Sequence, residues 1–217
     1  RDIVVTGVQT CALPISCGWR IVVFSGGEPL LRPDLLELIA YARSIGLRPV
    51  LGTNGILLTP QKVAELKQAG LAAAGISVDS VSPERHDWFR QSAGAWAATV
   101  EGMRVCREAG LPFQVHTTVM DWNEAEVLAI TDKAIEWGAA AHHIFFLVPT
   151  GRGDNIKDRS LPVEQQETLL SNILEKQRQV SIELKPTCAP QFMRIASQKA
   201  IPMRFRKGCI AGTAYCV

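Results

Sequence analysis

The sequence has 217 residues, a formal net charge of +2, 47% hydrophobic residues and 20% charged residues, which is typical of a globular protein with one domain and part of a second. Lysine and arginine are dispersed, apart from the short cluster RFRK at residues 204–207, so charge does not favour nucleic acid as a partner. No apolar run approaches the roughly 18 to 20 residues of a membrane span, and no signal peptide is recognisable. We therefore expect a cytoplasmic protein without a nucleic-acid or membrane partner.

The N-terminal segment is unusual. Its stretch VTGVQTCALPI, at residues 5–15, resembles the translation of a common short-read sequencing adapter, codon for codon, and Arg1-Asp2 fits the adapter bases upstream. We predict that residues 1–16 are an adapter artefact and exclude Cys11 from any metal site.

Strand and helix signals alternate along the rest of the chain. Apolar, β-branched runs predict strands at residues 20–24, 48–52, 74–78, 113–119 and 142–148. Helices are predicted from Pro33-Asp34, from Thr59-Pro60 to Gly70, from Ser82-Pro83, and over residues 96–109, 123–137 and 162–180. This alternation predicts an α/β fold of parallel strands with right-handed crossovers, either a complete or partial (β/α) barrel or a doubly wound sheet.

The residues that follow the predicted strands are small or polar. They are the segments SGGEP at 25–29, GTNG at 52–55, Ser77 with Asp79-Ser80, HTT at 116–118 and PTGRG at 149–153. In both candidate folds function lies at the carboxyl ends of the strands. Such a rim suits a compact zwitterionic ligand, with Glu28 accepting from an ammonium group. The alternative is that these residues only form turns.

Cysteine and histidine residues supply the other candidates. Cys188, Cys209 and Cys216 lie in the last 30 residues of the chain, where in a cytosolic protein they favour a metal site over disulfides. Cys17 and Cys106 are predicted to be core residues. His142 and His143 are adjacent on a strand, so their side chains point to opposite faces and only one of them can enter a barrel.

Several motifs resemble the radical S-adenosylmethionine (radical SAM) enzymes. They are FSGGEPLLRPDLLELIAYARSIGLRPVLGTNGILLT from residue 24, SVDSVSPERHDWFR from residue 77, and AHHIFFLVPTGRG, TCAP and GCIAGTAYC further on. The later motifs are similar to the group that converts siroheme derivatives to haem or haem d1 and carries a C-terminal SPASM-type auxiliary-cluster domain. The resemblance implies a partial radical SAM barrel over residues 17–153, a linking helix and strand over 154–184, and a truncated cluster domain over 185–217.

The resemblance also implies the cofactors and their residues. The methionine part of S-adenosylmethionine (SAM) would contact Gly26, Gly27 and Glu28. Its ribose or carboxylate would contact Ser77 and Arg90, and its adenine would contact Val148 and Pro149. Asn54 and Thr117 would line the same cavity. Cys188, Cys209 and Cys216 would ligate an auxiliary iron–sulfur cluster. Either His142 or His143 would contact the substrate, and Arg152, Arg194, Arg204 and Arg206 would pair with its carboxylates.

A radical SAM enzyme also needs a Cys-x3-Cys-x2-Cys loop for its [4Fe-4S] cluster, and this sequence contains no such triplet. We therefore expect the chain to be an inactive fragment of an active parent. The parent is expected to act on an iron tetrapyrrole, with a ferredoxin or flavodoxin as electron donor, and to deacetylate didecarboxysiroheme. The alternatives are oxidative decarboxylation of iron-coproporphyrin propionates to haem, a peptide-modifying enzyme of the same group, and a non-catalytic tetrapyrrole-binding scaffold.

Overall fold

The fold is built on one parallel sheet. The computed structural model describes residues 20–148 and 151–201, without the side chains of residues 151–153. In this part of the chain six strands follow one another in the sheet in chain order. They are β1 (Ile21–Phe24), β2 (Arg48–Thr53), β3 (Ala73–Ser77), β4 (Phe113–Val119), β5 (Ala141–Phe146) and β6 (Glu183–Thr187).

Helices connect successive strands, and one more helix follows the last described strand. They are η1 (Pro29–Leu31), α2 (Leu35–Ser44), α3 (Pro60–Ala69), α4 (Pro83–Arg90), α5 (Ala95–Glu108), η2 (Glu124–Glu126), α6 (Val127–Trp137), η3 (Gly151–Arg159), α7 (Val163–Gln177) and α8 (Phe192–Gln198). The predicted helix signals are present: the Thr59 side chain accepts a hydrogen bond from the amide of Lys62 at the start of α3, and Gly70 and Gly138 end α3 and α6 in the left-handed conformation.

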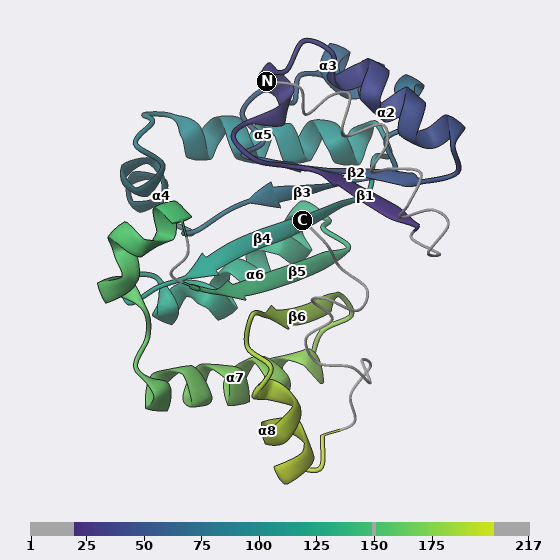
Figure 1. Cartoon of the computed structure of the whole chain (residues 1–217). Coiled ribbons are helices and arrows are strands. Elements are labelled where there is room, and N and C mark those ends of the chain that lie inside the picture. Colours follow the sequence, from purple (N-terminus) through teal and green to yellow (C-terminus); the bar gives the residue numbers. More distant parts are fainter. Residues whose placement is uncertain (1–19, 149–150, 202–217) are drawn as a thin grey trace.

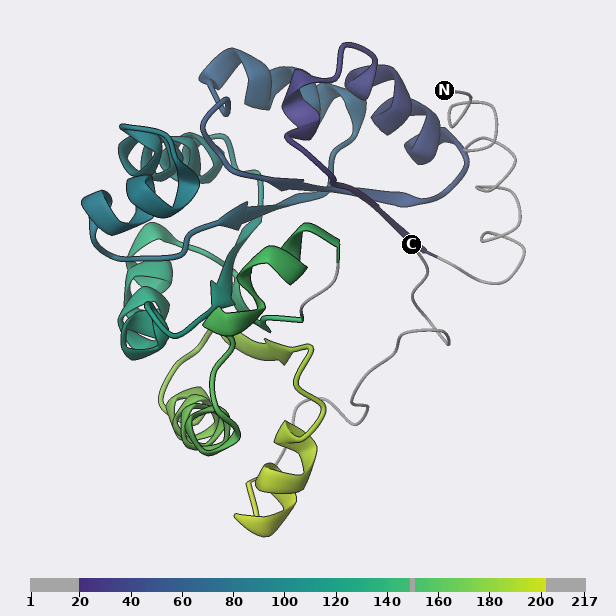
Figure 2. The same cartoon turned by 60° about the vertical axis from the view of Figure 1, so that its left-hand side comes forward.

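The strand order decides between the two predicted architectures. A doubly wound sheet requires a point at which the strand order reverses, whereas here every neighbour is the next strand along the chain and every pair is parallel. Because each right-handed crossover leads to the next strand on the same side, the connecting helices lie on one face of the sheet. Figures 1 and 2 show this arrangement, in which the sheet curves with α3, α5, α6 and α7 on its outer side. The predicted partial barrel is confirmed.

The two faces of the sheet differ in chemistry. On the helix side, Leu51, Ile76, Val115 and Ile144 are at most 1% exposed and belong to the two hydrophobic clusters of the core. Successive strand residues point to opposite faces, so the alternate residues Gly52, Gly75, His116 and His143 form the concave inner face. The inner face is therefore where a ligand can be held.

The linking strand that the resemblance implies within residues 154–184 is β6, and it extends beyond residue 184. β6 pairs with β5 from Glu183 to Thr187, so the domain boundary expected before Lys185 falls inside a strand. Residues 1–19, with the adapter-like segment, Cys11 and Cys17, and residues 202–217, with Cys209, Cys216, Arg204 and Arg206, lie outside the described residues. No helix in the described part of the chain is long and apolar enough to cross a membrane.

Candidate functional site at the carboxyl ends of the strands

The loop between β1 and η1 contains Gly26, Gly27 and Glu28. Gly26 has φ +127°, a conformation that side chains rarely adopt, and a Cβ added to either glycine would meet no atom within 4 Å. Both glycines are exposed. The backbone here is therefore open to a ligand that approaches closely.

The Glu28 carboxylate is fixed by three hydrogen bonds. Oε1 accepts from the Thr53 hydroxyl at 2.7 Å and from the Leu30 amide at 3.1 Å, and Oε2 accepts from the Asn54 amide at 2.8 Å. Because an ionised carboxylate has about four acceptor positions, one position remains on Oε2. The carboxylate is thus held in place at the end of β2 with capacity for one further donor.

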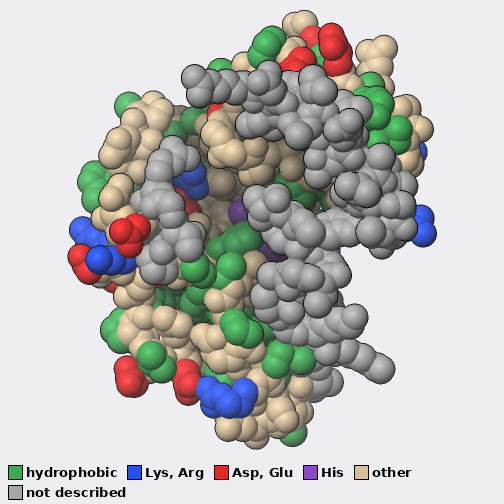
Figure 3. All heavy atoms as spheres, in the orientation of Figure 1, with side chains coloured by type: hydrophobic (Ala, Val, Ile, Leu, Met, Phe, Trp, Pro, Cys, Tyr) green, Lys and Arg blue, Asp and Glu red, His purple; other side chains and the backbone are tan. Residues whose placement is uncertain are grey.

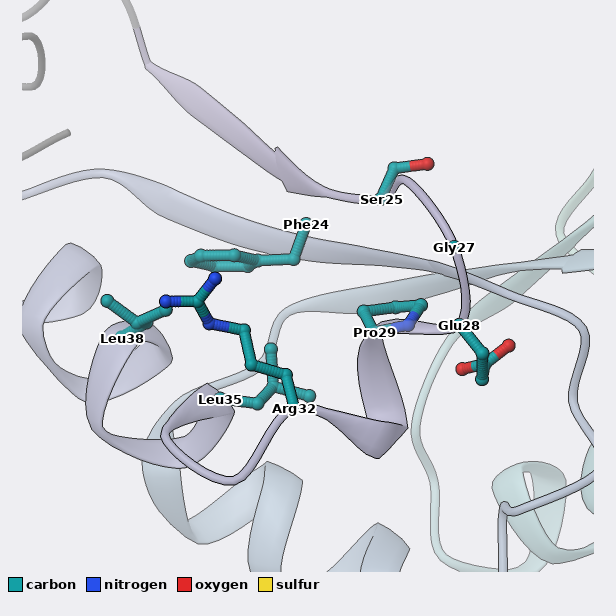
Figure 4. A pocket seen from close by; sticks show the side chains of 8 residues that line it. All are labelled: Phe24, Ser25, Gly27, Glu28, Pro29, Arg32, Leu35 and Leu38. Atoms are coloured by element: carbon teal, nitrogen blue, oxygen red, sulfur yellow. The ribbon is translucent and has the colours of Figure 1, made fainter. Parts of the chain in front are cut away.

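A hollow of about 340 Å³ lies beside this loop and is lined by residues of β1, the loop and α2: Phe24, Ser25, Gly27, Glu28, Pro29, Arg32, Leu35 and Leu38. Figure 4 shows the Glu28 carboxylate pointing away from Arg32 and Leu38. Arg32 is paired with Asp34 at 2.5 Å. Glu28 thus lines the hollow, and its carboxylate points away from the end of the hollow that Arg32 and Leu38 form.

Asn54 and Ser77 occupy the ends of neighbouring strands. The Asn54 side chain accepts from the amide of Ile56 at 2.9 Å, and its carbonyl accepts from the Thr99 hydroxyl at 2.8 Å. Asn54 thus shapes the loop after β2. Ser77 is the last residue of β3 and is level with His116 of β4, so it lies on the inner face as a ligand contact requires.

Arg90 is held by a buried carboxylate. Its Nε and Nη2 atoms lie 2.8 and 2.6 Å from Oδ2 of Asp79, whose side chain has no exposed surface. Oδ1 of Asp79 accepts from the amide of Thr118 at 3.2 Å, and the Asp79 amide donates to Nδ1 of His86 at 3.3 Å. Burial lowers the pKa of His86, so this ring is a neutral acceptor. Arg90, for which the resemblance implies a contact with the cofactor, is thus one partner of an ion pair that joins α4 to the loop after β3.

Thr117, predicted to line the cofactor cavity, lies on the helix side of the sheet together with His142. Thr117 and His142 are fully buried. The Thr117 hydroxyl donates to the carbonyl of Val78 and lies 2.9 Å from Nε2 of His142, whose Nδ1 is 2.9 Å from the Thr131 hydroxyl on α6. Thr117 shares the face of Val115 and Val119, so it cannot line a cavity on the inner face. The prediction that only one of the two adjacent histidines enters the barrel is confirmed, and that residue is His143.

An imidazole pair lies on the inner face. The rings of His116 and His143 are stacked, with centroids 5.3 Å apart and an interplanar angle of 7°, and the Phe145 ring lies 5.2 Å from His116. Burial lowers the pKa of His116 to about 4 and that of His143 to about 3. Both rings are therefore neutral at physiological pH. The sequence predictions did not assign a role to His116, although its alternation with buried Val115 and Thr117 places it on the inner face.

Of the remaining predicted ligand contacts, one is exposed, one is already paired with a neighbour and two lie outside the described side chains. Val148 is 47% exposed, and Arg194 on α8 pairs with Glu167 of α7 and donates to Gln198, partners that compete with any substrate carboxylate. Pro149 and the Arg152 side chain lie outside the described part of the structure.

The described cysteines occupy different environments. Cys106 is buried in the core, as predicted, and burial raises the pKa of its thiol to about 11, whereas Cys188 after β6 is exposed with φ 61°. Among the described residues no group of three His, Cys, Asp or Glu side chains could hold a metal ion. Of the three predicted ligands of an auxiliary cluster, only Cys188 lies in the described part of the chain.

Comparison with known proteins identifies relatives of this fold and site. The family model of the radical SAM superfamily matches residues 12–134. The AdoMet-dependent heme synthase of Methanosarcina barkeri is 43% identical over 213 residues, covering 93% of this chain and 60% of that protein. The Fe-coproporphyrin III synthase of the same organism is 36% identical over 165 residues, covering 76% of this chain and 41% of that protein. The chain thus spans less than two thirds of the length of either relative.

A solved structure supports the fold. The crystal structure of Streptococcus suis SuiB bound to precursor peptide SuiA superposes with a TM-score of 0.67 at 13% identity, covering 81% of this chain and 40% of that one. At this identity the likeness concerns the fold alone, and it agrees with the partial barrel described above.

Proposed function

Because the chain belongs to the radical SAM superfamily, we propose that it is the barrel portion of an enzyme that modifies the side chains of an iron tetrapyrrole in haem biosynthesis. The observation that carries this proposal is the 43% identity to an AdoMet-dependent heme synthase over 93% of the chain. The activity, substrate and partners proposed here are those of the whole protein, since the chain spans only 60% of that relative.

Of the two tetrapyrrole reactions, conversion of iron-coproporphyrin to haem is favoured. Two relatives from one organism allow a direct comparison, and the heme synthase exceeds the Fe-coproporphyrin III synthase both in identity, 43% against 36%, and in coverage of this chain, 93% against 76%. This reverses the preference drawn from the motifs alone. Deacetylation of didecarboxysiroheme is the second candidate.

The residues at the carboxyl ends of the strands fit SAM. Gly26 and Gly27 leave space for the methionine backbone, and the oriented Glu28 carboxylate has one acceptor position for its ammonium group. Arg90 is held at the same end of the sheet by Asp79, and Ser77 faces inward at the end of β3. We propose that these residues orient the cofactor, which with a reduced [4Fe-4S] cluster supplies a hydrogen-abstracting radical when bound.

The proposed enzyme also requires an auxiliary iron–sulfur cluster and an electron donor. Cys188, Cys209 and Cys216 remain proposed ligands of an auxiliary cluster, and a ferredoxin or flavodoxin remains the proposed electron donor.

The test is a substrate panel. The whole parent protein, prepared anaerobically with its iron–sulfur content restored, is incubated with SAM and a reductant together with iron-coproporphyrin III, didecarboxysiroheme or a ribosomal precursor peptide, and the products are analysed by mass spectrometry. We expect haem from iron-coproporphyrin III and 5'-deoxyadenosine in parallel. Turnover of didecarboxysiroheme alone would favour the second candidate, and turnover of the peptide alone would refute both.

A Glu28→Gln variant separates an enzyme from a binding scaffold. If the parent catalyses the reaction with SAM, the variant loses formation of 5'-deoxyadenosine while it still binds iron-coproporphyrin III. A parent that binds the tetrapyrrole but never forms 5'-deoxyadenosine would instead be a non-catalytic scaffold.

A further inference from the structure

The inner face of the sheet carries an imidazole pair, one ring of which packs against a glycine of the neighbouring strand. Gly52 of β2 and Gly75 of β3 are hydrogen-bond neighbours in the sheet, and a Cβ added to Gly75 would lie 2.2 Å from Cε1 of His116. The His116 ring therefore extends over β3, and this position tolerates no side chain on Gly75. Figure 3 shows histidine side chains within a hollow of this face, beside hydrophobic ones.

The hydrogen bonds of His116 determine which ring nitrogen carries the proton. Its Nε2 lies 3.3 Å from Oε1 of Gln114, an oxygen that can only accept. The proton is therefore on Nε2, and the lone pair of the neutral ring is on Nδ1. A histidine that ligates a metal commonly donates its other N–H to an oxygen in this way, which fixes its tautomer and its orientation.

The second imidazole supports the first. His143 stacks on His116 in a nearly parallel orientation, and Phe145 closes the same aromatic group. Nε2 of His143 is buried with no hydrogen-bond partner among the described residues, because Oε1 of Glu183 lies 3.7 Å away, beyond hydrogen-bond range. The stack and Gln114 together hold the His116 ring in one orientation.

We propose that His116, held by His143 and Gln114, is an axial nitrogen ligand to the iron of the tetrapyrrole substrate, bound on the inner face of the sheet. This inference rests on the proposed function. The described residues hold no group of three side chains for a free metal ion, but a tetrapyrrole supplies its own four equatorial nitrogens and needs only one ligand from the protein. Ile21 and Val23 of β1, at 52% and 49% exposed, add apolar surface for the macrocycle.

The test titrates ferric iron-coproporphyrin III into the whole parent protein, without SAM and with oxidised clusters, and follows the Soret band and the electron paramagnetic resonance spectrum. We expect a low-spin, nitrogen-ligated iron. His116→Ala and His116→Gln lose this signal, whereas His143→Phe retains it because a phenyl ring preserves the stack. Gln114→Ala keeps the ligand and weakens binding about tenfold, as is usual for an outer partner of a metal-bound histidine.

His142→Gln is the matched control, since His142 faces α6, and circular dichroism verifies the fold of each variant. If the His116 variants retain the low-spin signal, or if His143→Phe alone abolishes it, the assignment is wrong. A wild-type protein that turns over iron-coproporphyrin III with high-spin iron refutes the axial ligand and leaves the proposed function standing. A protein that neither binds nor converts any tetrapyrrole refutes the proposed function itself.

Discussion

The guanidinium of Arg90 donates a hydrogen bond from Nε to Oδ2 of Asp79 at 2.8 Å, and its Nη2 lies 2.6 Å from the same oxygen. The two side chains differ sharply in exposure, 30% for Arg90 against 0% for Asp79. The consequences of removing either partner are therefore unequal. Loss of Asp79 leaves a cation that water can reach, whereas loss of Arg90 leaves an anion inside the protein.

We predict that Arg90→Ala lowers the free energy of unfolding by about 3 to 5 kcal/mol, and that Asp79→Ala lowers it by less. Urea denaturation followed by circular dichroism measures both. Arg104→Ala is the control, because Arg104 pairs with Glu101 and Glu108 on an exposed helix face and its loss is expected to cost at most about 1 kcal/mol. Equal losses for all three variants would contradict the unequal burial.

Glu28→Gln tests the oriented carboxylate. The carboxylate only accepts, and its three donors are Thr53 and the amides of Leu30 and Asn54, so an amide group places a donor against at least one of them. We expect affinity for SAM to fall at least about tenfold, equivalent to about 1.4 kcal/mol, in isothermal titration. Arg32→Ala is the control, because Arg32 pairs with Asp34 and not with Glu28, and it is expected to bind SAM normally.

Gly75→Ala tests the contact between β3 and His116. The new methyl group would lie 2.2 Å from Cε1 of the ring, so we expect a loss of about 1 to 3 kcal/mol in the free energy of unfolding. Gly27→Ala meets no atom within 4 Å and is expected to stay within about 0.5 kcal/mol. In the double variant Gly75→Ala/His116→Ala the clash is absent, so the losses should fall short of additivity. Additive losses would exclude the contact as the cause.

The sequence predicted the features that depend on local chemistry. Thr59-Pro60 and Gly70 mark the ends of α3 because an N-cap side chain and a left-handed glycine satisfy the helix termini locally. β6 produced no comparable signal, since its segment Glu183–Thr187 contains Pro186 and two charged residues rather than an apolar run. Its pairing with β5 depends on the tertiary structure.

The candidate site was predicted less completely, because it too depends on the tertiary structure. Successive residues of β4 point to opposite faces of the sheet, but only the position of the helices shows which face is the inner one. Thr117 was predicted to lie on the inner face, whereas it lies on the helix side. Asp79 and Arg90 are eleven residues apart in the numbering, and a turn and a helix bring them together. The identification of His116 likewise needed its neighbours from β3 and β5.

Cys106 should be chemically inert in the folded protein. Burial raises the pKa of its thiol to about 11, so at pH 8 only about one thiol in a thousand is ionised, and the thiolate is the reactive form. We expect iodoacetamide to modify Cys106 only in urea, at concentrations where the protein unfolds, as measured by peptide mass spectrometry. Rapid modification in native buffer would show that the core around α5 opens.

The histidines of the barrel predict how stability depends on pH. Burial holds the pKa of His116 at about 4 and those of His142 and His143 at about 3, whereas in the unfolded chain each is close to 6.5. Between these values the unfolded state binds more protons than the folded state, so stability is complete above about pH 6.5 and falls as the pH decreases toward 4. Each histidine contributes up to about 1.4 kcal/mol per pH unit within this window.

The histidine contribution can be separated from that of the carboxylates, which titrate at lower pH. Urea denaturation at several values between pH 6.5 and 5 gives the slope, and His116→Gln is expected to reduce it by up to about 1.4 kcal/mol per pH unit because one of the four proton-binding differences is removed. His86→Gln is expected to reduce the slope as well, since burial also lowers the pKa of that ring. A slope that His116→Gln leaves unchanged would mean that His116 is protonated in the folded protein, which would also deprive it of the lone pair that an iron ligand requires.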